Sequence, residues 1–398
     1  MAALRQNANK IWPVFIVFLR LGLTSFGGPV AHLGYFRNEF VLKRQWLSEQ
    51  HYADLVALCQ FLPGPASSQL GMAIGLGRAG LGGLLAAWCG FTLPSAIALM
   101  VFAEQLTHTA TPISSGLLHG LKLVAVAVVA QAVWGMARSF CKSRRHMVVA
   151  VLSAFAGLVW ISPWSQIAII AVAALIGLFF GPADSEKPQE IFSAGIRRRT
   201  GTLLLLIAGA LLLGLPLAQN LYPSRLLDVF AVFYTTGAMV FGGGHVVLPL
   251  LQGAILQTGW LSQDLFLAGY GAAQAVPGPL FTFAAFLGYV LHVVPQDWLG
   301  GMLCLLAIFL PSLLLVMGAL PHWQSLRYNR YARGALNEVN AAVVGVLLAA
   351  LYQPIWISSV FQPIDFAFVL ISLVALTQWR APPWLVVFGA GFCGWQWL

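Results

Sequence analysis

Charge is scarce in this chain of 398 residues. Asp, Glu, Lys and Arg together make up 8% of it, whereas a soluble globular domain carries about 25% of these residues. Hydrophobic residues account for 59%, and they occur in runs close to the roughly 20 residues that cross the hydrocarbon core of a bilayer. These features exclude an ordinary soluble enzyme and predict an integral membrane protein with many spans.

Metal-binding and catalytic sequence patterns are also lacking. The five cysteines form no C-x-x-C pair and most lie within apolar runs, so we interpret them as small packing residues rather than disulfides or metal ligands. The sequence contains no H-E-x-x-H, no G-x-S-x-G and no Walker loop. We therefore expect no metal, no cofactor and no enzyme activity.

The few charges that are present are mostly basic, with a formal net charge of +9. The basic residues cluster in short loops between apolar runs, which is the pattern that orients membrane proteins. We therefore expect the lipid bilayer, and not nucleic acid, as the partner of this charge. An anionic substrate is a second interpretation, and the net charge alone does not choose between them. A homodimer is a possible assembly.

The apolar runs predict an all-helical protein with about 10–13 membrane segments. One long polar stretch, 182–200, interrupts them and has the composition of a linker. The predicted segments are 11–33, 52–76, 80–103, 117–137, 147–161, 164–181, 201–218, 226–247, 264–290, 299–319, 338–357, 363–377 and 383–398.

The two groups of segments repeat each other. Four short motifs occur twice, in the same order, with each second copy about 215 residues after the first, and internal duplication is common among transporters. The motifs are Phe-Gly-Gly at Phe26 and Phe241, Trp-Leu-Ser at Trp46 and Trp260, Pro-Gly-Pro at Pro63 and Pro277, and Leu-Pro-Ser at Leu93 and Leu310.

Basic residues are distributed oppositely in the two copies. Loop 34–51 contains three Lys or Arg residues, whereas its counterpart 248–263 contains none; loop 104–116 contains none, whereas 320–336 contains three. Under the positive-inside rule this reversal predicts an inverted repeat. We assign residues 1–181 to the first half, 226–398 to the inverted second half, and 182–225 to a linker with one connecting membrane helix.

The first segment poses a conflict. Arg5 and Lys10 place the amino terminus in the cytoplasm, and the basic residues of loop 34–51 place that loop there too. Both hold if segment 11–33 enters the membrane, breaks at Gly27-Gly28-Pro29 and returns. Segment 52–76 could do the same at Pro63-Gly64-Pro65. The alternative is thirteen simple spans, which violates the rule only at loop 34–51.

The Pro-Gly-Pro motifs are candidate substrate sites. Each proline removes a backbone donor, and such breaks in a membrane helix are tolerated where they line a cavity or are buried in protein. Breaks at corresponding positions of two repeats point to the substrate site. The sequence after the first break, with Ser67, Ser68 and Gln69, would open a half-helix whose N–H groups and hydroxyls suit an oxyanion. A packing kink is the plainer interpretation.

The glycine motifs and two cations are further candidates. Gly27-Gly28 and Gly243-Gly244 allow either close approach to a substrate or helix packing, and His245 follows the second motif. Arg20 and Lys122 lie within apolar segments and could balance the charge of an anion, although Arg20 could instead reach a membrane surface. No carboxylate stands out as a proton carrier, since Glu39, Asp54, Glu104 and Glu338 are all expected at segment ends or in loops.

The candidate substrate-binding residues lie either at a break in a membrane segment or within an apolar segment. They are Arg20, Gly27, Gly28, Gln60, Pro63, Gly64, Pro65, Ser67, Ser68, Gln69, Lys122, Gly243, Gly244, His245, Gln274, Pro277, Gly278, Pro279 and Thr282.

The same motifs strongly resemble those of the chromate transporter family, in its long form with two domains. The resemblance is carried by Phe26-Gly27-Gly28-Pro29, by the stretch from Ala57 to Gln69, by Phe91-Thr92-Leu93-Pro94-Ser95, and by the second-half motifs at Phe241 and Val276-Pro277-Gly278-Pro279. The resemblance covers nearly the whole chain. It implies a bacterial cytoplasmic-membrane protein that exports chromate and is driven by an ion gradient.

The residues alone lead only to an inverted-repeat anion transporter. Chromate and sulfate are both tetrahedral dianions of similar size, and serine hydroxyls with helix N-termini would hardly distinguish them. Transport of sulfate or another oxyanion, and an anion-selective channel, therefore stay open as alternatives.

Overall fold

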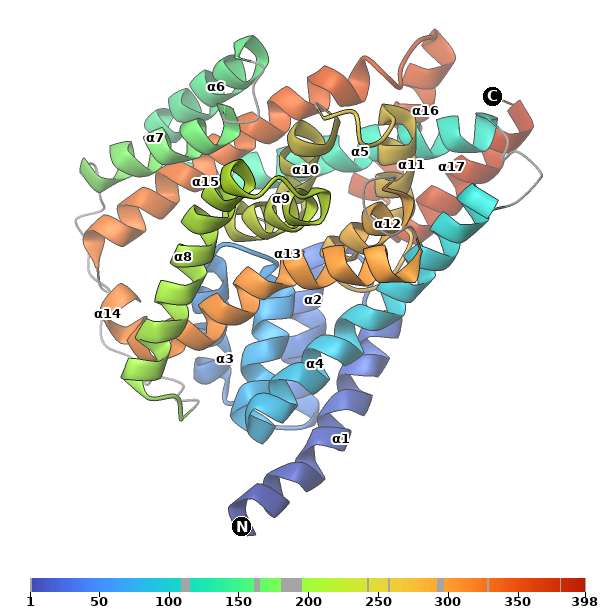
Figure 1. The fold of residues 1–398 in the computed structure, drawn as a ribbon. Helices are drawn as coiled ribbons and strands as arrows, with labels where there is room; N and C mark the ends of the chain where they lie inside the picture. Colours follow the sequence, from blue (N-terminus) through green and yellow to red (C-terminus); the bar gives the residue numbers. More distant parts are fainter. Residues whose placement is uncertain are drawn as a thin grey trace.

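The structure of the protein is a computed structural model that describes residues 2–108, 115–160, 165–179, 195–241, 243–256, 258–291, 297–327, 329–379 and 381–397. All regular secondary structure in these ranges is helical (Figure 1). The predicted all-helical class is therefore confirmed. Most of the polar stretch 182–200 lies outside the described residues, which resume at residue 195.

The first half contains helices up to residue 179. They are α1 (Ala2–Thr24), α2 (Gly28–Arg37), the π-helical segment η1 (Asn38–Lys43), α3 (Glu49–Phe61), α4 (Ala66–His108), α5 (Ser115–Phe140), α6 (Arg144–Val159) and α7 (Ser165–Phe179). Helix α4 is two helices in fact, because Ala79 and Gly80 leave helical geometry and Gly80 takes a φ of +65°. Such a φ is readily adopted only by glycine.

The second half follows the connecting helix α8 (Arg198–Leu221). Its elements are α9 (Arg225–Met239), η2 (Gly244–Val246), α10 (Val247–Leu256), α11 (Gln263–Ala273), η3 (Leu280–Thr282), α12 (Phe283–Val290), α13 (Trp298–Ala319), η4 (Leu320–His322), α14 (Trp323–Arg327), α15 (Arg330–Ala350), η5 (Leu351–Trp356), α16 (Pro363–Thr377) and α17 (Pro383–Trp397).

Five helical stretches in the described part of the chain are long and apolar enough to cross a membrane. They are Ala66–Thr107, Gly116–Phe140, Arg198–Gln219, Trp298–His322 and Arg330–Trp356. The stretch in α8 has only 11% of its most apolar window buried inside the protein, against 61–72% in the other four. Helix α8 therefore presents leucines such as Leu206 and Leu213 outward, as a helix at a lipid boundary does.

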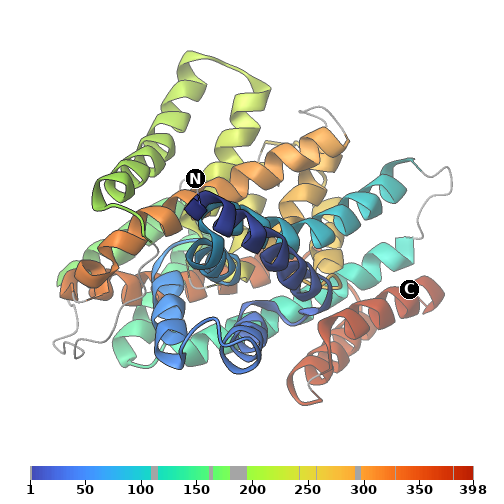
Figure 2. The ribbon, with the colours of Figure 1, turned by 90° about the horizontal axis from the view of Figure 1, so that it is seen from below.

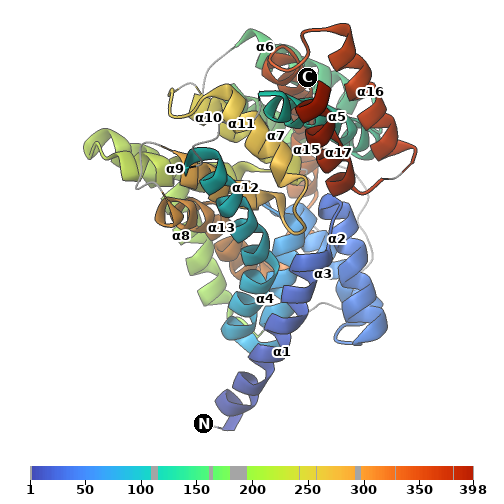
Figure 3. The same ribbon diagram turned by 90° about the vertical axis from the view of Figure 1, so that its right-hand side faces the viewer.

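Helices α1 and α2 form a hairpin. Helix α1 ends at Thr24, the chain turns at Gly27 (φ +100°), and α2 runs back along α1. The ring of Phe18 in α1 packs against those of Phe36 and Phe40, at 5.6 and 5.0 Å between centroids. The tip of this hairpin therefore lies near the centre of the molecule, and its open end lies toward the amino terminus (Figure 3).

Helix α3 and the first part of α4 form a second hairpin beside the first. Its tip is the Pro-Gly-Pro break, and its far end returns to the loop after η1, where the Arg78 guanidinium lies 5.0 Å from the Trp46 ring centroid. The longer part of α4 then runs back alongside α1, with Gly82 against Ile11 and Gly90 against Leu19. Both hairpins thus open at the end of the molecule that holds the amino terminus.

The second half repeats these contacts, which supports two homologous halves. Gly22 approaches the backbone of Gly90, and its counterpart Gly237 approaches that of Ile308. Close backbone approach of this kind is the usual role of small residues in membrane helices. In the second half the corresponding hairpins are α9–α10 and α11–α12. Phe102 near the end of α4 stacks on Phe286 in α12, and α10 and α11 lie on the side of the molecule away from the amino terminus (Figure 1).

The two halves exchange their last helices. Helices α6 and α7 of the first half pack on α15 of the second, with Gly177 against the Gly334 backbone. Helices α16 and α17 pack on α5, with Gly120 against the backbone of Ala390 (Figure 2). This interlocking joins the halves along two long seams and leaves the four hairpin tips facing one another at the centre.

Candidate functional site

The four breaks in the chain meet through two reciprocal hydrogen bonds. The Gly64 N–H, in the first Pro-Gly-Pro motif, donates to the Val240 carbonyl at 2.7 Å, and the Gly278 N–H, in the second motif, donates to the Ser25 carbonyl at 2.9 Å. Ser25 and Val240 are the residues immediately before the two Phe-Gly-Gly motifs. Each Pro-Gly-Pro break is therefore bonded to the glycine break of the other half.

The same two glycines also contact the serine of the opposite Leu-Pro-Ser motif. Gly64 and Gly278 have φ values of +121° and +97°, which side chains other than glycine rarely adopt. A Cβ atom on Gly278 would lie 2.9 Å from Ser95 Oγ, and one on Gly64 would clash with Ser312 Oγ. Both copies of three of the four repeated motifs thus meet at one central site. These motifs are Phe-Gly-Gly, Pro-Gly-Pro and Leu-Pro-Ser.

Polar side chains from the first half surround the first Pro-Gly-Pro break. His32 lies 3.2 Å from the Ser67 hydroxyl through Nδ1 and 3.1 Å from the Ser25 carbonyl through Nε2. The Gln69 amide donates to the Pro63 carbonyl at 2.6 Å, which satisfies a carbonyl freed by the break. Ser67 and part of Gln69 therefore already have partners in this arrangement.

Several buried hydroxyls at the centre have no hydrogen-bond partner among the described residues. They belong to Ser25, Ser68, Thr92 and Ser312, and the Gln69 amide oxygen shares this property. An unsatisfied buried polar group costs about 1–3 kcal/mol, so a cluster of them is unusual in a site that serves packing alone. The cluster offers hydroxyl donors to a polar ligand.

A cavity of about 50 Å³ adjoins the glycine break of the first half. Gly28 begins α2 there, and no side chain caps this helix end, so its free N–H groups and positive dipole end favour an anion. His245 and Gln274 of the second half also line the cavity, and the Gln274 amide nitrogen has no partner among the described residues. The polar groups that line this cavity are thus mainly uncharged hydrogen-bond donors.

Tyr270 orients His245 in this cavity. Its hydroxyl lies 2.9 Å from His245 Nδ1; when that hydroxyl donates, the histidine proton is on Nε2. A Cβ on Gly28 would lie 3.9 Å from this Nε2 atom, so Nε2 faces the glycine break. In this tautomer the imidazole adds one more donor to the cavity.

The remaining predicted residues of the breaks occupy varied positions. Thr282, the counterpart of Ser68, is buried but donates to the Pro279 carbonyl at 2.8 Å. Gly244 packs against Pro29, Gly243 has a φ of +140° with open space beside it, and Gln60 is exposed on α3. The flanking prolines Pro63, Pro65, Pro277 and Pro279 shape the two breaks themselves.

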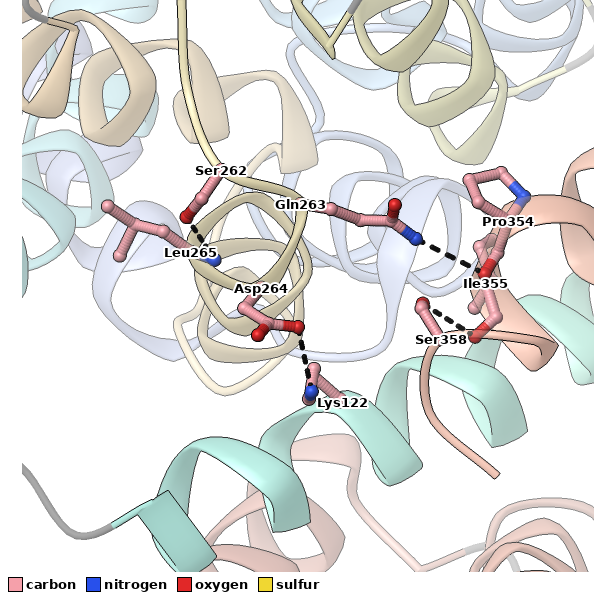
Figure 4. A network of polar contacts seen from close by, with 8 residues as sticks. All are labelled: Lys122, Ser262, Gln263, Asp264, Leu265, Pro354, Ile355 and Ser358. Carbon is pink, nitrogen blue, oxygen red and sulfur yellow. Dashed lines mark hydrogen bonds and ion pairs between the residues drawn. The ribbon is translucent and has the colours of Figure 1, made fainter. Parts of the chain in front are cut away.

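The structure does not bring the two predicted cations to the breaks. Arg20 is exposed on α1. Lys122 forms a 2.8 Å ion pair with Asp264 at the start of α11 (Figure 4), whereas Gln274 follows the last residue of that helix, about 15 Å away at 1.5 Å per residue. In this arrangement the central site contains no cation from either residue.

Sequence reasoning missed part of the central cluster. Ser25, Thr92, Ser95 and Ser312 are not among the candidates it gives, although all four lie in or beside the repeated motifs, and that recurrence is the signal that could have found them. The expectation that Glu338 lies at a segment end is wrong, because Glu338 is fully buried in the third turn of α15 and pairs with Arg145 at 2.7 Å. Asp54 is also buried and accepts from the Trp323 indole at 2.8 Å.

Comparison with known proteins identifies the relatives of this chain. The sequence model of the family described as "Chromate transporter" matches twice, at residues 12–178 and 227–395. The chain is 29% identical to a probable chromate transport protein of Synechococcus elongatus, over 84% of this chain and 81% of that protein. It is 24% identical to a chromate transport protein of Pseudomonas aeruginosa (96% and 91%) and 25% identical to one of Cupriavidus metallidurans (84% and 80%). No solved structure matches the chain.

Proposed function

The chain belongs to the chromate transporter family, and on this premise we propose that it exports chromate across a bacterial cytoplasmic membrane, driven by an ion gradient, most simply of protons. The observation that carries the proposal is the pair of reciprocal hydrogen bonds from Gly64 to Val240 and from Gly278 to Ser25. They join four broken helices at one polar point inside a membrane protein, which is how inverted-repeat transporters build a substrate site.

The proposed membrane arrangement is an inverted repeat of two halves, 1–181 and 226–398, with α8 as the connecting span in 182–225. The hairpins α1–α2 and α3–α4 enter from the cytoplasm and return to it. The basic residues at their open end, Arg37, Lys43, Arg44 and Arg78, support this orientation. The second pair of hairpins enters from the opposite side, where the loop between α10 and α11 has no Lys or Arg.

The substrate in this proposal is a tetrahedral oxyanion held at the breaks. Helix N–H groups at Gly28, the Gln274 amide, His245 Nε2 and the hydroxyls of Ser68 and Ser312 supply donors for its oxygens. Because every one of these groups is uncharged in the stated form, the proposed site would bind a dianion through geometry and hydrogen bonds alone, without a counter-charge. Sulfate offers the same oxygens, so chromate selectivity has to be measured.

The experiment is chromate uptake into inverted membrane vesicles, with and without a proton gradient and with sulfate as competitor. Accumulation that depends on the gradient supports a coupled exporter, and the effect of sulfate measures selectivity. Equilibration without accumulation would instead indicate an anion channel. Absence of chromate movement with correctly inserted protein would overturn the proposed substrate.

A further inference from the structure

A second, larger cavity lies in the second half, beside its hairpins. It has a volume of about 590 Å³ and is bounded by α9, α10 and α15, together with parts of α6, α7 and α8. At one end it is lined by the exposed residues Thr258 and Gln353, and at the other by the buried Thr236. Met239, which also lines it, directly precedes Val240, the acceptor of the Gly64 hydrogen bond. The cavity therefore reaches from the protein surface to a hairpin tip.

The repeat shows what occupies the corresponding space in the first half. The two Leu-Pro-Ser motifs are 217 residues apart, and this offset makes Trp384 of α17 the counterpart of Ile167 of α7, which lines the large cavity. Trp384 instead packs on Phe26, with 6.1 Å between ring centroids. The small cavity at Gly28 is lined by Pro383, which is next to Trp384 in the chain. The cavity of the first half is thus confined to the tip of the α1–α2 hairpin.

We propose that the large cavity is the passage by which the oxyanion leaves the central site for the face opposite the amino terminus, and that Phe26 and Trp384 close the equivalent passage toward the amino-terminal face. This inference rests on the proposed transport function. One passage is wide and the other shut in the same structure, which is the asymmetry that alternating access between inverted repeats requires.

The large cavity has a mainly apolar lining that includes a few uncharged polar groups, which are the candidate contacts of an anion in transit. The Gln252 side chain is buried, and its amide nitrogen has no partner among the described residues. Thr235 and Thr236 add hydroxyls, and no Asp or Glu lines the cavity within the described part of the chain. Weak, uncharged donors hold a solute loosely enough for it to leave.

The repeat also gives Arg20 a place in this scheme. Arg20 precedes Phe26 by six residues, as Thr235 precedes Phe241, so Arg20 is the counterpart of a residue that lines the large cavity. When the first-half passage opens, Arg20 would line it on the amino-terminal side.

Cysteine accessibility tests the large passage. Met239→Cys, in a functional variant whose five native cysteines are replaced, should react with a charged, membrane-impermeant thiol reagent only from the face opposite the amino terminus. The reaction should abolish chromate accumulation. Leu213→Cys, on the exposed face of α8, is the lipid-facing control and should react only with a membrane-permeant maleimide. If Met239→Cys behaves like this control, the cavity holds lipid and the inference is overturned.

A second pair of variants tests the closure. Gln131→Cys lines the small cavity and should react slowly from the amino-terminal face; adding Trp384→Ala should speed the reaction, whereas Trp384→Phe, which keeps an aromatic ring, should not. An unchanged rate with Trp384→Ala would overturn the gate. These labelling rates do not depend on the substrate, so they stay informative even if vesicle uptake shows that chromate is not carried.

Discussion

The Gly64 N–H donates to the Val240 carbonyl across the boundary between the two halves of the chain, over 2.7 Å. The repeat places Gly278 and Ser25 in the same relationship, with the roles of the halves exchanged. Each Pro-Gly-Pro tip is therefore hydrogen-bonded to the other half of the chain, so these two bonds link the halves at the centre.

Alanine at Gly64 or Gly278 should abolish transport and lower stability. The positive φ at each position disfavours any Cβ, at a cost of about 1–3 kcal/mol, and the Cβ would also press on Ser312 or Ser95. Transport in vesicles and thermal unfolding in detergent are the measurements. Gly135→Ala is the matched control, because Gly135 is helical with open space beside it. Normal transport by Gly64→Ala would contradict the role of the break.

The two serines after the first break should respond differently to alanine. Ser68 Oγ has no partner among the described residues, so Ser68→Ala should leave stability unchanged while it weakens chromate transport. Ser67 contacts His32, so Ser67→Ala should lower stability by about 1 kcal/mol. Expression level, thermal unfolding and the KM for chromate distinguish the two. Unchanged uptake kinetics in Ser68→Ala would refute a direct contact between Ser68 and the substrate.

Much of this centre could be predicted from the sequence, because backbone breaks leave a local signature. A Pro-Gly-Pro sequence inside an apolar run predicts a break, whereas single prolines such as Pro94 and Pro311 stay within helices. The recurrence of the motif at Pro63 and Pro277 is enough to indicate a shared site. The reciprocal hydrogen bonds could not be predicted in the same way. They join residues far apart in the chain, and only the interlocked packing of the halves determines which carbonyl each glycine meets.

The positions of the charged residues also depend on tertiary contacts, so they are harder to predict from the sequence. Arg20 is a candidate because it lies within an apolar run, but a run does not reveal which face of the helix turns outward. Lys122 has its partner Asp264 on a distant helix, and Glu338 has Arg145. Pairing across the two halves depends on tertiary contacts, which neither periodicity nor the positive-inside rule encodes.

The loops of the two hairpin pairs should be accessible from opposite sides of the membrane. Lys43→Cys, in the basic loop of the first half, should be labelled only from the cytoplasm, because its hairpin enters and leaves on that side. Thr258→Cys, in the corresponding uncharged loop of the second half, should be labelled only from the periplasm. Impermeant maleimide applied to intact cells and to inverted vesicles reads both positions. Periplasmic labelling of Lys43→Cys would exclude the re-entrant arrangement and favour simple spans.

The ion pair between Glu338 and Arg145 should stabilise the exchange of helices between the halves. Glu338 is fully buried on α15, and Arg145 of α6 reaches it with a side chain that is 43% exposed. Arg145→Met leaves a buried carboxylate without its closest cation. In a site that excludes water, this change lowers the free energy of unfolding by about 3–5 kcal/mol. Because the Arg145 side chain is partly exposed and His146 lies 3.5 Å from the carboxylate, the loss should be about 3 kcal/mol. Chemical unfolding in detergent measures it.

Replacing both partners of this pair separates charge compensation from packing. Arg145→Met combined with Glu338→Leu removes the buried charge together with its partner, and such replacements are often neutral or stabilising. The double variant should therefore regain most of the stability that the single variant loses. If it also keeps gradient-dependent chromate transport, Glu338 is a structural carboxylate. Loss of coupling with intact stability would instead identify Glu338 as the proton carrier that the sequence alone did not reveal.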